Sequence, residues 1–371
     1  MPVGDGARRP PIPDNIAMAD RLDEYRRKRD AARTPEPVPP DAPTRGANDR
    51  FVIQQHHARA LHWDLRLERD GVLVSWAVPR GLPRDQVRNH LAVHTEDHPM
   101  EYLTFHGDIP AGEYGGGRMH VFDTGTYETE KWRADEVMVV LHGARVEGRY
   151  VLFRTARPEP GKREEWMIRR MSPPADGWEP LPDLIRPSRP TPVDTLPEPD
   201  DEWAFEMRWD GTRAVAYVSG GRVRVMSMSD QDISGGYPAV RDMGPALAPT
   251  EAVLDGEIVA FDKQGRVRAA PTTAAGRRPP PGLVISYLAY DLLWLEGRRT
   301  VDLPYTQRRE LLDGLALSGP TWQTPPSFRG GGEFALEAAA EQGLPGVVAK
   351  RLDSVYTPGR RTKDWLRIDN T

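Results

Sequence analysis

The stretch that most constrains this chain is His56–Glu68, which reads HHARALHWDLRLE. Polar and apolar residues alternate through its second half, which predicts a strand, because successive side chains of a strand point to opposite faces. His62, Asp64 and Arg66 would then share one polar face. The Asp70-Gly71 pair follows directly and predicts a tight hairpin turn with a returning strand after it.

Two imidazoles and a carboxylate on a rigid strand pair form a donor set for a divalent transition metal. The candidate ligands are His56, His62 and Asp64. This donor set suits manganese, with zinc possible, and the absence of cysteine argues against a structural thiolate zinc site. Arg66, in the same row, would hold a phosphate beside the metal. The alternative is an ordinary strand with a solvated polar face.

Residues 51–171 predict short strands separated by Gly and Pro turns, and such a series favours a closed or nearly closed β-barrel. A polar row turned into this barrel would offer a metal pocket. The segment Glu113–Gly117 (EYGGG) lacks the Lys-Ser/Thr and the helix of a phosphate-binding loop, so it predicts a turn. The expected strands are Phe51–Gln55, Leu61–Arg69, Val72–Val78, His90–Thr95, Arg118–Asp123, Val137–His142, Gly148–Arg154 and Glu165–Arg169.

The length of 371 residues predicts a multidomain chain with two main domains. Residues 1–44 are expected to be a disordered N-terminus, clearest over Met1–Asp14, with a short charged helix over Ile16–Ala32. Residues 45–171 form the expected barrel domain. Nine prolines lie between residues 172 and 201, which predicts a stiff linker over 172–184 and a second domain over 185–371.

The charge balance is mildly acidic, with 50 Lys+Arg against 55 Asp+Glu, so nucleic-acid contacts would depend on local basic patches. The lack of cysteine excludes disulfides and fits a reducing compartment. No apolar run is long enough to span a membrane, and the N-terminus has no hydrophobic signal core. We therefore expect a soluble, cytoplasmic, nucleoid-associated protein.

Three blocks occur in an order that resembles the 3'-phosphoesterase domain of bacterial DNA ligase D, an end-joining repair enzyme. They are FVIQQHHARALHWDLRLERDGVLVSWAVPRG, EDHPMEYLTFHGDIPAGEYGGG and a strand-rich stretch ending in WMIRRM, and the resemblance covers about residues 21–171. It implies metal-dependent removal of a 3'-phosphate or 3'-ribonucleotide from a DNA end, leaving a 3'-OH. The implied metal ligands are His56, His62 and Asp64, and the implied catalytic residues are Arg66, His98 and Tyr102.

The same resemblance implies four supporting residues. Asp30 and Glu36 would support the metal site. Arg80 would hold phosphate where the family often has Lys, and His90 would do so where the family usually has Arg. The change to His90 makes this positive charge depend on pH.

The second half resembles the adenylation domain of ATP-dependent DNA ligases over about residues 185–368. The blocks FEMRWDGTRAVAYV, VLDGEIVAFD, YLAYDLLWLEG and GVVAKRLDSVYTPGRRTKDWLRI carry the resemblance. It implies an α/β nucleotidyltransferase-like fold of antiparallel sheets with a helix over Tyr305–Leu315. No OB-fold domain is expected, because the chain ends at Thr371. Residues at nucleotide-contacting positions either bind ATP or AMP or only hold the fold together; they are Glu206, Arg208, Arg213, Glu257, Tyr290, Lys350 and Arg367.

Arg208 occupies the position of the catalytic lysine of these ligases. Their reaction begins when a neutral amine attacks the α-phosphate of ATP. A guanidinium with a pKa above ~12 keeps its proton, so Arg208 should not attack. Pro345 also stands where the resemblance implies a metal-assisting glutamate.

The leading hypothesis is therefore a metal-dependent 3'-end-processing phosphoesterase for double-strand-break repair, fused to a ligase-like domain that does not ligate. The protein would bind DNA 3' ends. Its expected protein partners are a Ku-like end-binding protein and separate ligase or polymerase chains. One alternative is a non-catalytic scaffold that binds DNA ends or repair partners. A second is an active ATP-dependent ligase completed by another chain.

Overall fold

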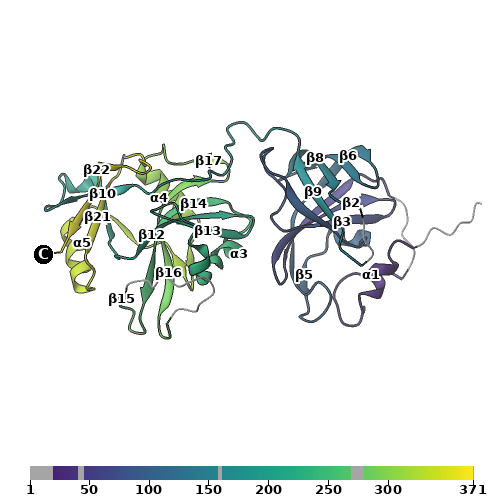
Figure 1. Ribbon diagram of the computed structural model, residues 1–371, viewed down its shortest axis with the longest axis horizontal. Helices are drawn as coiled ribbons and strands as arrows, with labels where there is room; N and C mark the ends of the chain where they lie inside the picture. The colour runs from purple at the N-terminus through teal and green to yellow at the C-terminus, as the bar shows by residue number, and fades with distance from the viewer. Residues whose placement is uncertain (1–19, 41–45, 158–160, 269–279, 371) are drawn as a thin grey trace, which may run out of the picture. The chain divides into compact units, whose positions relative to one another are not determined.

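The computed structural model describes residues 20–40, 46–157, 161–268 and 280–370. The chain divides into two compact units, Met1–Val78 with Leu91–Ile168 and Pro79–His90 with Arg169–Thr371. Each unit has its own sheets (Figure 1). The segment Met1–Asp14, for which disorder was expected, lies outside the described residues. Within the described ranges, no helix has the length and apolar character needed to cross a membrane.

The first unit is a closed antiparallel barrel of eight strands, as predicted. The strands follow the order β1-β2-β3-β4-β9-β8-β7-β6, and pairing of β1 with β6 closes the ring. A short strand, β5 (Gly107–Ile109), pairs antiparallel with the first residues of β6. The barrel strands are β1 (Arg50–His57), β2 (Leu61–Arg69), β3 (Val72–Val78), β4 (His90–His94), β6 (Gly117–Trp132), β7 (Glu136–Gly143), β8 (Glu147–Arg154) and β9 (Glu165–Arg170).

The turn between β2 and β3 forms at the predicted Asp70-Gly71 pair. Both residues have positive φ, 54° and 86°. A two-residue hairpin loop with positive φ at both positions matches the twist of the flanking strands, which explains the preference for Asp-Gly here. The register pairs Arg69 with Val72 across this turn, and so fixes the faces of both strands.

The apolar rows of the strands fill the barrel. Along β7, Val137, Val139 and Leu141 are buried while their neighbours are partly or fully exposed. Leu141 pairs with Tyr127 of β6, and the barrel is too narrow to hold more than side chains. The interior is therefore the apolar side of the sheet.

The polar row of β2 faces outward, and the expectation that it turns into the barrel is wrong. Glu68 of this row pairs with Leu73 of β3. Leu73 packs with Tyr25 of α1 (Asp23–Arg27) and with Tyr102 of the 3-10 helix η1 (Met100–Leu103). Since cross-strand partners share a face, these two short helices lie over the polar row, and a barrel of eight strands has no room for them inside. Close packing favours the apolar row inside, and the polar row receives a separate lid.

The helix α1 is shorter than expected. The sequence predicted a helix over Ile16–Ala32, of which residues 16–19 lie outside the described ranges. The described helix covers Asp23–Arg27. The chain then turns, because the Asp30 carbonyl accepts from the amides of Arg33 and Thr34 while the Asp30 side chain accepts from Ala32 N.

The second unit has the expected mixed fold of two sheets with flanking helices. The smaller sheet has the order β10-β22-β21-β11-β20, in which β10 is parallel to β22 and the other pairs are antiparallel. Its strands are β10 (Arg189–Val193), β22 (Arg361–Asp369), β21 (Gly346–Arg351), β11 (Trp203–Met207) and β20 (Ser327–Arg329).

The larger sheet follows the order β13-β12-β14-β16-β19-β18, with β15 beside β14 and β17 beside β16. These strands are β13 (Arg222–Ser227), β12 (Thr212–Ser219), β14 (Ala252–Phe261), β16 (Val284–Leu295), β19 (Trp322–Gln323), β18 (Ser318–Gly319), β15 (Val267–Arg268) and β17 (Arg298–Arg299).

Helices cover both sheets of the second unit. Residues of α2 and α3 and Leu312 of α4 join the core of the larger sheet, and α5 packs on the smaller sheet through Ala335 and Ala339. The helix predicted over Tyr305–Leu315 is present as α4. The helices of this unit are α2 (Pro238–Arg241), α3 (Met243–Leu247), α4 (Tyr305–Gly314) and α5 (Gly332–Glu341), with 3-10 helices η2 (Asp200–Glu202) and η3 (Ser234–Gly236).

Candidate metal centre

The three candidate metal ligands lie together on the outer face of the first unit. The β1–β2 register pairs His56 with His62 and Gln54 with Asp64, so these side chains share a face. His56 Nδ1 lies 3.7 Å from Asp64 Oδ2, and His62 Nε2 lies 3.6 Å from Asp64 Oδ1. One ligand atom from each residue falls within 4.8 Å of the others. This spacing leaves room for one cation between them.

The protonation of the two imidazoles fits a metal site. His62 Nδ1 lies 3.0 Å from the Ala60 carbonyl, which can only accept, so Nδ1 carries the proton and Nε2 presents its lone pair to Asp64. His56 Nε2 is buried and has no hydrogen-bond partner among the described residues. A buried polar atom without a partner needs an explanation, and a cation bound through Nε2 would supply one, whereas the nitrogen nearest Asp64 is Nδ1. Two imidazoles with one carboxylate suit manganese or zinc.

Arg66 holds the carboxylate of this set in place. Its guanidinium donates to Asp64 Oδ2 at 2.9 Å, to Gln54 Oε1 at 2.7 Å and to Ser75 Oγ at 2.9 Å. Burial would raise the pKa of Asp64, but Arg66 and the two imidazoles lower it well below its usual range. Asp64 is thus ionised. Arg66 uses three of its five N–H groups in these contacts, and its predicted contact with phosphate would fall to the other two.

His98 lies buried under α1 as a neutral ring. Its Nδ1 is 2.8 Å from the Glu96 carbonyl and so carries the proton, while Nε2 is 3.5 Å from Arg29 Nη2. Burial, with help from Arg66 and Arg29, lowers the pKa of His98 well below its usual value. In this tautomer Nε2 can accept a hydrogen bond, while the lowered pKa disfavours its protonation.

Tyr102 and Glu36 form the next layer of the site. The Tyr102 hydroxyl donates to Glu36 Oε1, and the Thr34 hydroxyl donates to Glu36 Oε2 at 2.7 Å. Burial, with Tyr25 and Glu36 nearby, raises the pKa of Tyr102, so its hydroxyl keeps its proton. Glu36 thus lies in the network around Tyr102 and Arg29, and its support of the metal site stays a prediction. Asp30 does not join this network in the described structure, because its exposed side chain only caps a turn.

Arg29 and Glu96 are residues of the site that the sequence reasoning missed. Arg29 donates to Glu36 Oε1 at 2.7 Å and to Glu96 Oε1 at 3.0 Å, and all three side chains are almost fully buried. Lys28 reaches the other oxygen of Glu96 at 3.0 Å. The signal in the sequence was the basic run before Asp30, together with the acidic residue two positions before His98.

Arg80 and His90, the predicted phosphate ligands, belong to the segment Pro79–His90, which clusters with the second unit. His90 Nδ1 donates to the Gly81 carbonyl at 2.7 Å, and burial lowers the pKa of its ring. Arg80 is exposed. Their contact with a substrate stays a prediction.

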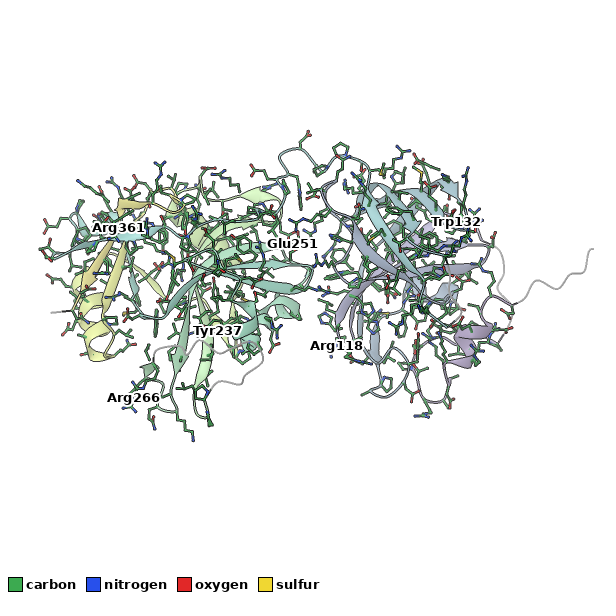
Figure 2. All side chains as sticks on the ribbon, in the orientation of Figure 1. Arg118, Trp132, Tyr237, Glu251, Arg266 and Arg361 are labelled. Carbon is green, nitrogen blue, oxygen red and sulfur yellow. The ribbon has the colours of Figure 1, made fainter. Side chains whose placement is uncertain are left out.

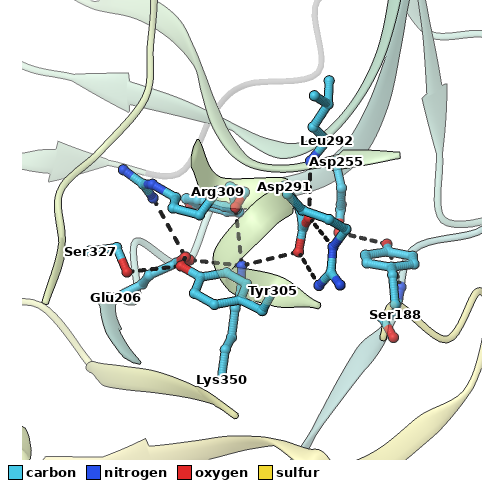
Figure 3. Close-up of polar contacts among 12 residues, drawn as sticks. Ser188, Glu206, Asp255, Asp291, Leu292, Tyr305, Arg309, Ser327 and Lys350 are labelled. Carbon is cyan, nitrogen blue, oxygen red and sulfur yellow. Dashed lines mark hydrogen bonds and ion pairs between the residues drawn. The ribbon is translucent and has the colours of Figure 1, made fainter. Parts of the chain in front are cut away.

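In the second unit, Glu206 and Lys350 form a buried charged cluster (Figure 3). Lys350 Nζ lies 3.0 Å from Glu206 Oε2 and 3.8 Å from Asp291 Oδ2. The Tyr305 hydroxyl donates to Glu206 Oε1 at 2.5 Å, and Lys350 also lies over the Trp365 ring. These charges are neutralised inside the protein.

Three further candidate nucleotide contacts, Arg213, Tyr290 and Glu257, also have partners within this unit. Arg213 donates to both oxygens of Asp255, at 2.9 and 2.5 Å. The Tyr290 hydroxyl donates to Glu257 Oε2 at 2.6 Å. Both pairs join neighbouring strands of the larger sheet, so they contribute to the fold whether or not a nucleotide binds.

Arg208, at the position expected for a nucleophile, is held by two carboxylates. It pairs with Asp210 Oδ1 at 2.9 Å and with Asp369 of β22. Arg367 also reaches Asp369, at 3.2 Å. Asp369 thus balances two arginines at this end of the smaller sheet.

Two families match the chain in succession. Residues 54–154 match the family described as the DNA Ligase D 3'-phosphoesterase domain, and residues 191–368 match the ATP dependent DNA ligase domain. The chain is 42% identical over 368 residues to the multifunctional non-homologous end joining protein LigD of Mycolicibacterium smegmatis. It is 43% identical over 354 residues to the corresponding repair protein of Mycobacterium tuberculosis.

These alignments cover 96% and 94% of this chain but 46% and 45% of the relatives, so the chain spans about half of their length. Among solved structures, a mycobacterial DNA ligase D complexed with ATP and MES is 34% identical, with a TM-score of 0.44, over 50% of this chain and 60% of that one. With both domain families matched in order and relatives aligned along nearly the whole sequence, this chain belongs to the DNA ligase D family and carries its 3'-phosphoesterase domain followed by an ATP-dependent ligase domain.

Proposed function

We propose that the first unit is a metal-dependent phosphoesterase that cleans the 3' ends of DNA during double-strand-break repair. The observation that carries this proposal is the cluster of His56, His62 and Asp64, in which one imidazole nitrogen is buried without a partner among the described residues. The relatives are named as end-joining repair proteins, which supports a broken DNA end as the substrate. The reaction adds water to a 3'-phosphate and yields a 3'-OH and inorganic phosphate.

A cation bound there, Mn²⁺ or alternatively Zn²⁺, would act as a Lewis acid on the phosphoryl oxygens. His56, His62 and Asp64 would hold it. Arg66 keeps Asp64 ionised and oriented, and its two remaining N–H groups are suited to a phosphate oxygen.

His98 is suited to accept a hydrogen bond through Nε2, since its ring is neutral and Nδ1 is committed to a carbonyl. Tyr102 is a hydroxyl donor whose orientation Glu36 fixes. Arg29 bridges Glu36 and Glu96, and so sets the position of both residues around His98.

The test is release of inorganic phosphate from a primer-template that carries a 3'-phosphate. We expect release with Mn²⁺ and none after chelation. A protein that binds this DNA but releases nothing under Mn²⁺ would instead support the scaffold hypothesis. A substrate with a single 3'-ribonucleotide, in the same assay, tests the second proposed activity.

We further propose that the second unit does not ligate by itself. Ligation requires an uncharged amine as nucleophile, whereas Arg208 is a guanidinium paired with Asp210 and Asp369. Binding of ATP or AMP by the remaining candidate residues stays a prediction. A Ku-like protein and separate ligase or polymerase chains are the partners we propose for the later steps of joining.

A further inference from the structure

The loop Glu113–Gly117, which the sequence marked only as a turn, lies against the candidate metal centre. Its glycines permit this approach. Gly115 has φ 77°, and a Cβ there would lie 4.0 Å from His56 Cε1. Gly117 has φ 146°, and a Cβ there would lie 2.4 Å from the His57 carbonyl oxygen. The positive φ favours glycine at position 115, beside His56, and the close approach to the His57 carbonyl requires glycine at position 117.

Tyr114 projects from this loop with 46% of its surface exposed. Among the described residues of the first unit, every other Phe, Tyr and Trp is buried or half-buried. Most aromatic side chains of this unit, such as Tyr25, Phe51 and Tyr102, are buried in its core. An exposed aromatic side chain beside a candidate active site suggests a ligand with a flat apolar face.

The ring is held in place by the same charged network that surrounds His98. Its hydroxyl lies 3.4 Å from Glu96 Oε2 and 3.4 Å from Lys28 Nζ. Lys28 Nζ lies 4.7 Å from the ring centroid, and the Arg29 guanidinium carbon lies 5.4 Å from it. The ring is thus positioned before any ligand arrives, beside two basic side chains that both pair with Glu96.

A platform of this kind matches single-stranded nucleic acid, which proteins bind by stacking bases on aromatic rings beside basic side chains. The base of a 3'-terminal nucleotide lies one sugar away from the 3'-phosphate. A phosphate at the metal centre would place that base near the loop next to His56. We propose that Tyr114 stacks on the base of the 3'-terminal nucleotide whose phosphate is removed. This inference rests on the proposed function and names how that site recognises its substrate.

The kinetic test compares two primer-templates with a 3'-phosphate, one with a normal terminal base and one with an abasic terminal sugar. We expect Tyr114→Ala to raise KM for the normal substrate about 5- to 100-fold, the range for loss of one base stack, and to leave the abasic substrate unchanged. Tyr114→Phe keeps the ring and should behave like the wild type. Val121→Ala, an exposed change on β6, is the matched control.

A fluorescence test does not depend on turnover. The fluorescence of a 3'-terminal 2-aminopurine bearing a 3'-phosphate should be quenched by the wild type and by Tyr114→Phe, and not by Tyr114→Ala. An equal loss by Tyr114→Ala on both kinetic substrates, or quenching that survives this change, would overturn the stacking proposal. A wild type that quenches but releases no phosphate would instead contradict the proposed function alone.

Discussion

His56 and His62 face each other across the β1–β2 pair, with their ring centroids 4.7 Å apart, and Asp64 lies within 4 Å of both. This arrangement follows from a register that joins the only two imidazoles of the outer polar row of these strands. The polar row is buried because α1 and η1 cover it from outside the barrel. The site is therefore a layer between a rigid barrel and a small lid.

Asp64→Asn should remove the affinity for metal while leaving the barrel folded. The amide keeps the shape of the side chain but not its charge, so we expect Mn²⁺ affinity to fall by about 100-fold or more. Titration calorimetry with Mn²⁺ measures this directly. Asp108→Asn, at an exposed carboxylate of the same unit, is the control and should change nothing. Unchanged metal binding by Asp64→Asn would exclude this residue as a ligand.

Arg29→Ala should destabilise the first unit strongly. Arg29 bridges Glu36 and Glu96, and its loss leaves two buried carboxylates without their shared partner. The expected cost is about 3–5 kcal/mol. Guanidinium unfolding of the full chain measures it, with Arg27→Ala, at the exposed last residue of α1, as the control. Equal midpoints for the two variants would show that the bridge contributes little.

The strands β2 and β3 and the clustering of His56, His62 and Asp64 could be predicted from the sequence because both are local, whereas metal binding by this cluster stays a prediction. Alternation and the Asp70-Gly71 turn predicted β2 and β3 with their observed bounds. His62 and Asp64 lie on one strand, and His56 lies at the end of the strand before it. The spatial order within such a hairpin follows almost directly from the order in the chain.

The lid over the site could not be predicted in the same way. Arg29 and Glu96 are separated by 67 positions, and they meet only because α1 folds onto the polar row. The alternation along β2 predicts one polar and one apolar face, but it does not determine which face lines the barrel interior. That choice depends on the apolar rows of all eight strands together. The helix over Ile16–Ala32 was predicted too long because the turn at Asp30 is closed by its own backbone.

Glu68 should make stability depend on acid pH. It is fully buried and accepts from Arg50 Nε at 2.8 Å. Burial would raise the pKa of Glu68, but the bond to Arg50 and nearby backbone N–H groups lower it below its usual 4.5. A lowered folded-state pKa means that the stabilisation is complete above about 4.5 and is lost as pH falls through the folded value.

The measurement for Glu68 compares unfolding midpoints at about pH 7 and about pH 3.5 for the wild type and Glu68→Gln. The wild type should lose more stability on acidification, since the variant has no carboxyl group to protonate at this position. Parallel losses in both proteins would mean that Glu68 is not coupled to folding.

Incubation with radiolabelled ATP should leave the wild type unlabelled, because Arg208 cannot act as an amine nucleophile. Arg208→Lys should gain little label, since Asp210 and Asp369 would keep the new ammonium protonated. Adding Asp369→Asn to that variant should increase the label. Labelling of the wild type would contradict the proposed loss of ligation chemistry.

The central claim is that His56, His62 and Asp64 bind one divalent cation. Anomalous diffraction from crystals grown with Mn²⁺ tests it most directly. We expect one strong peak about 2.0–2.3 Å from a nitrogen of each histidine and from a carboxylate oxygen of Asp64. Ordered side chains with no peak between them, or a peak bound elsewhere, would contradict the account.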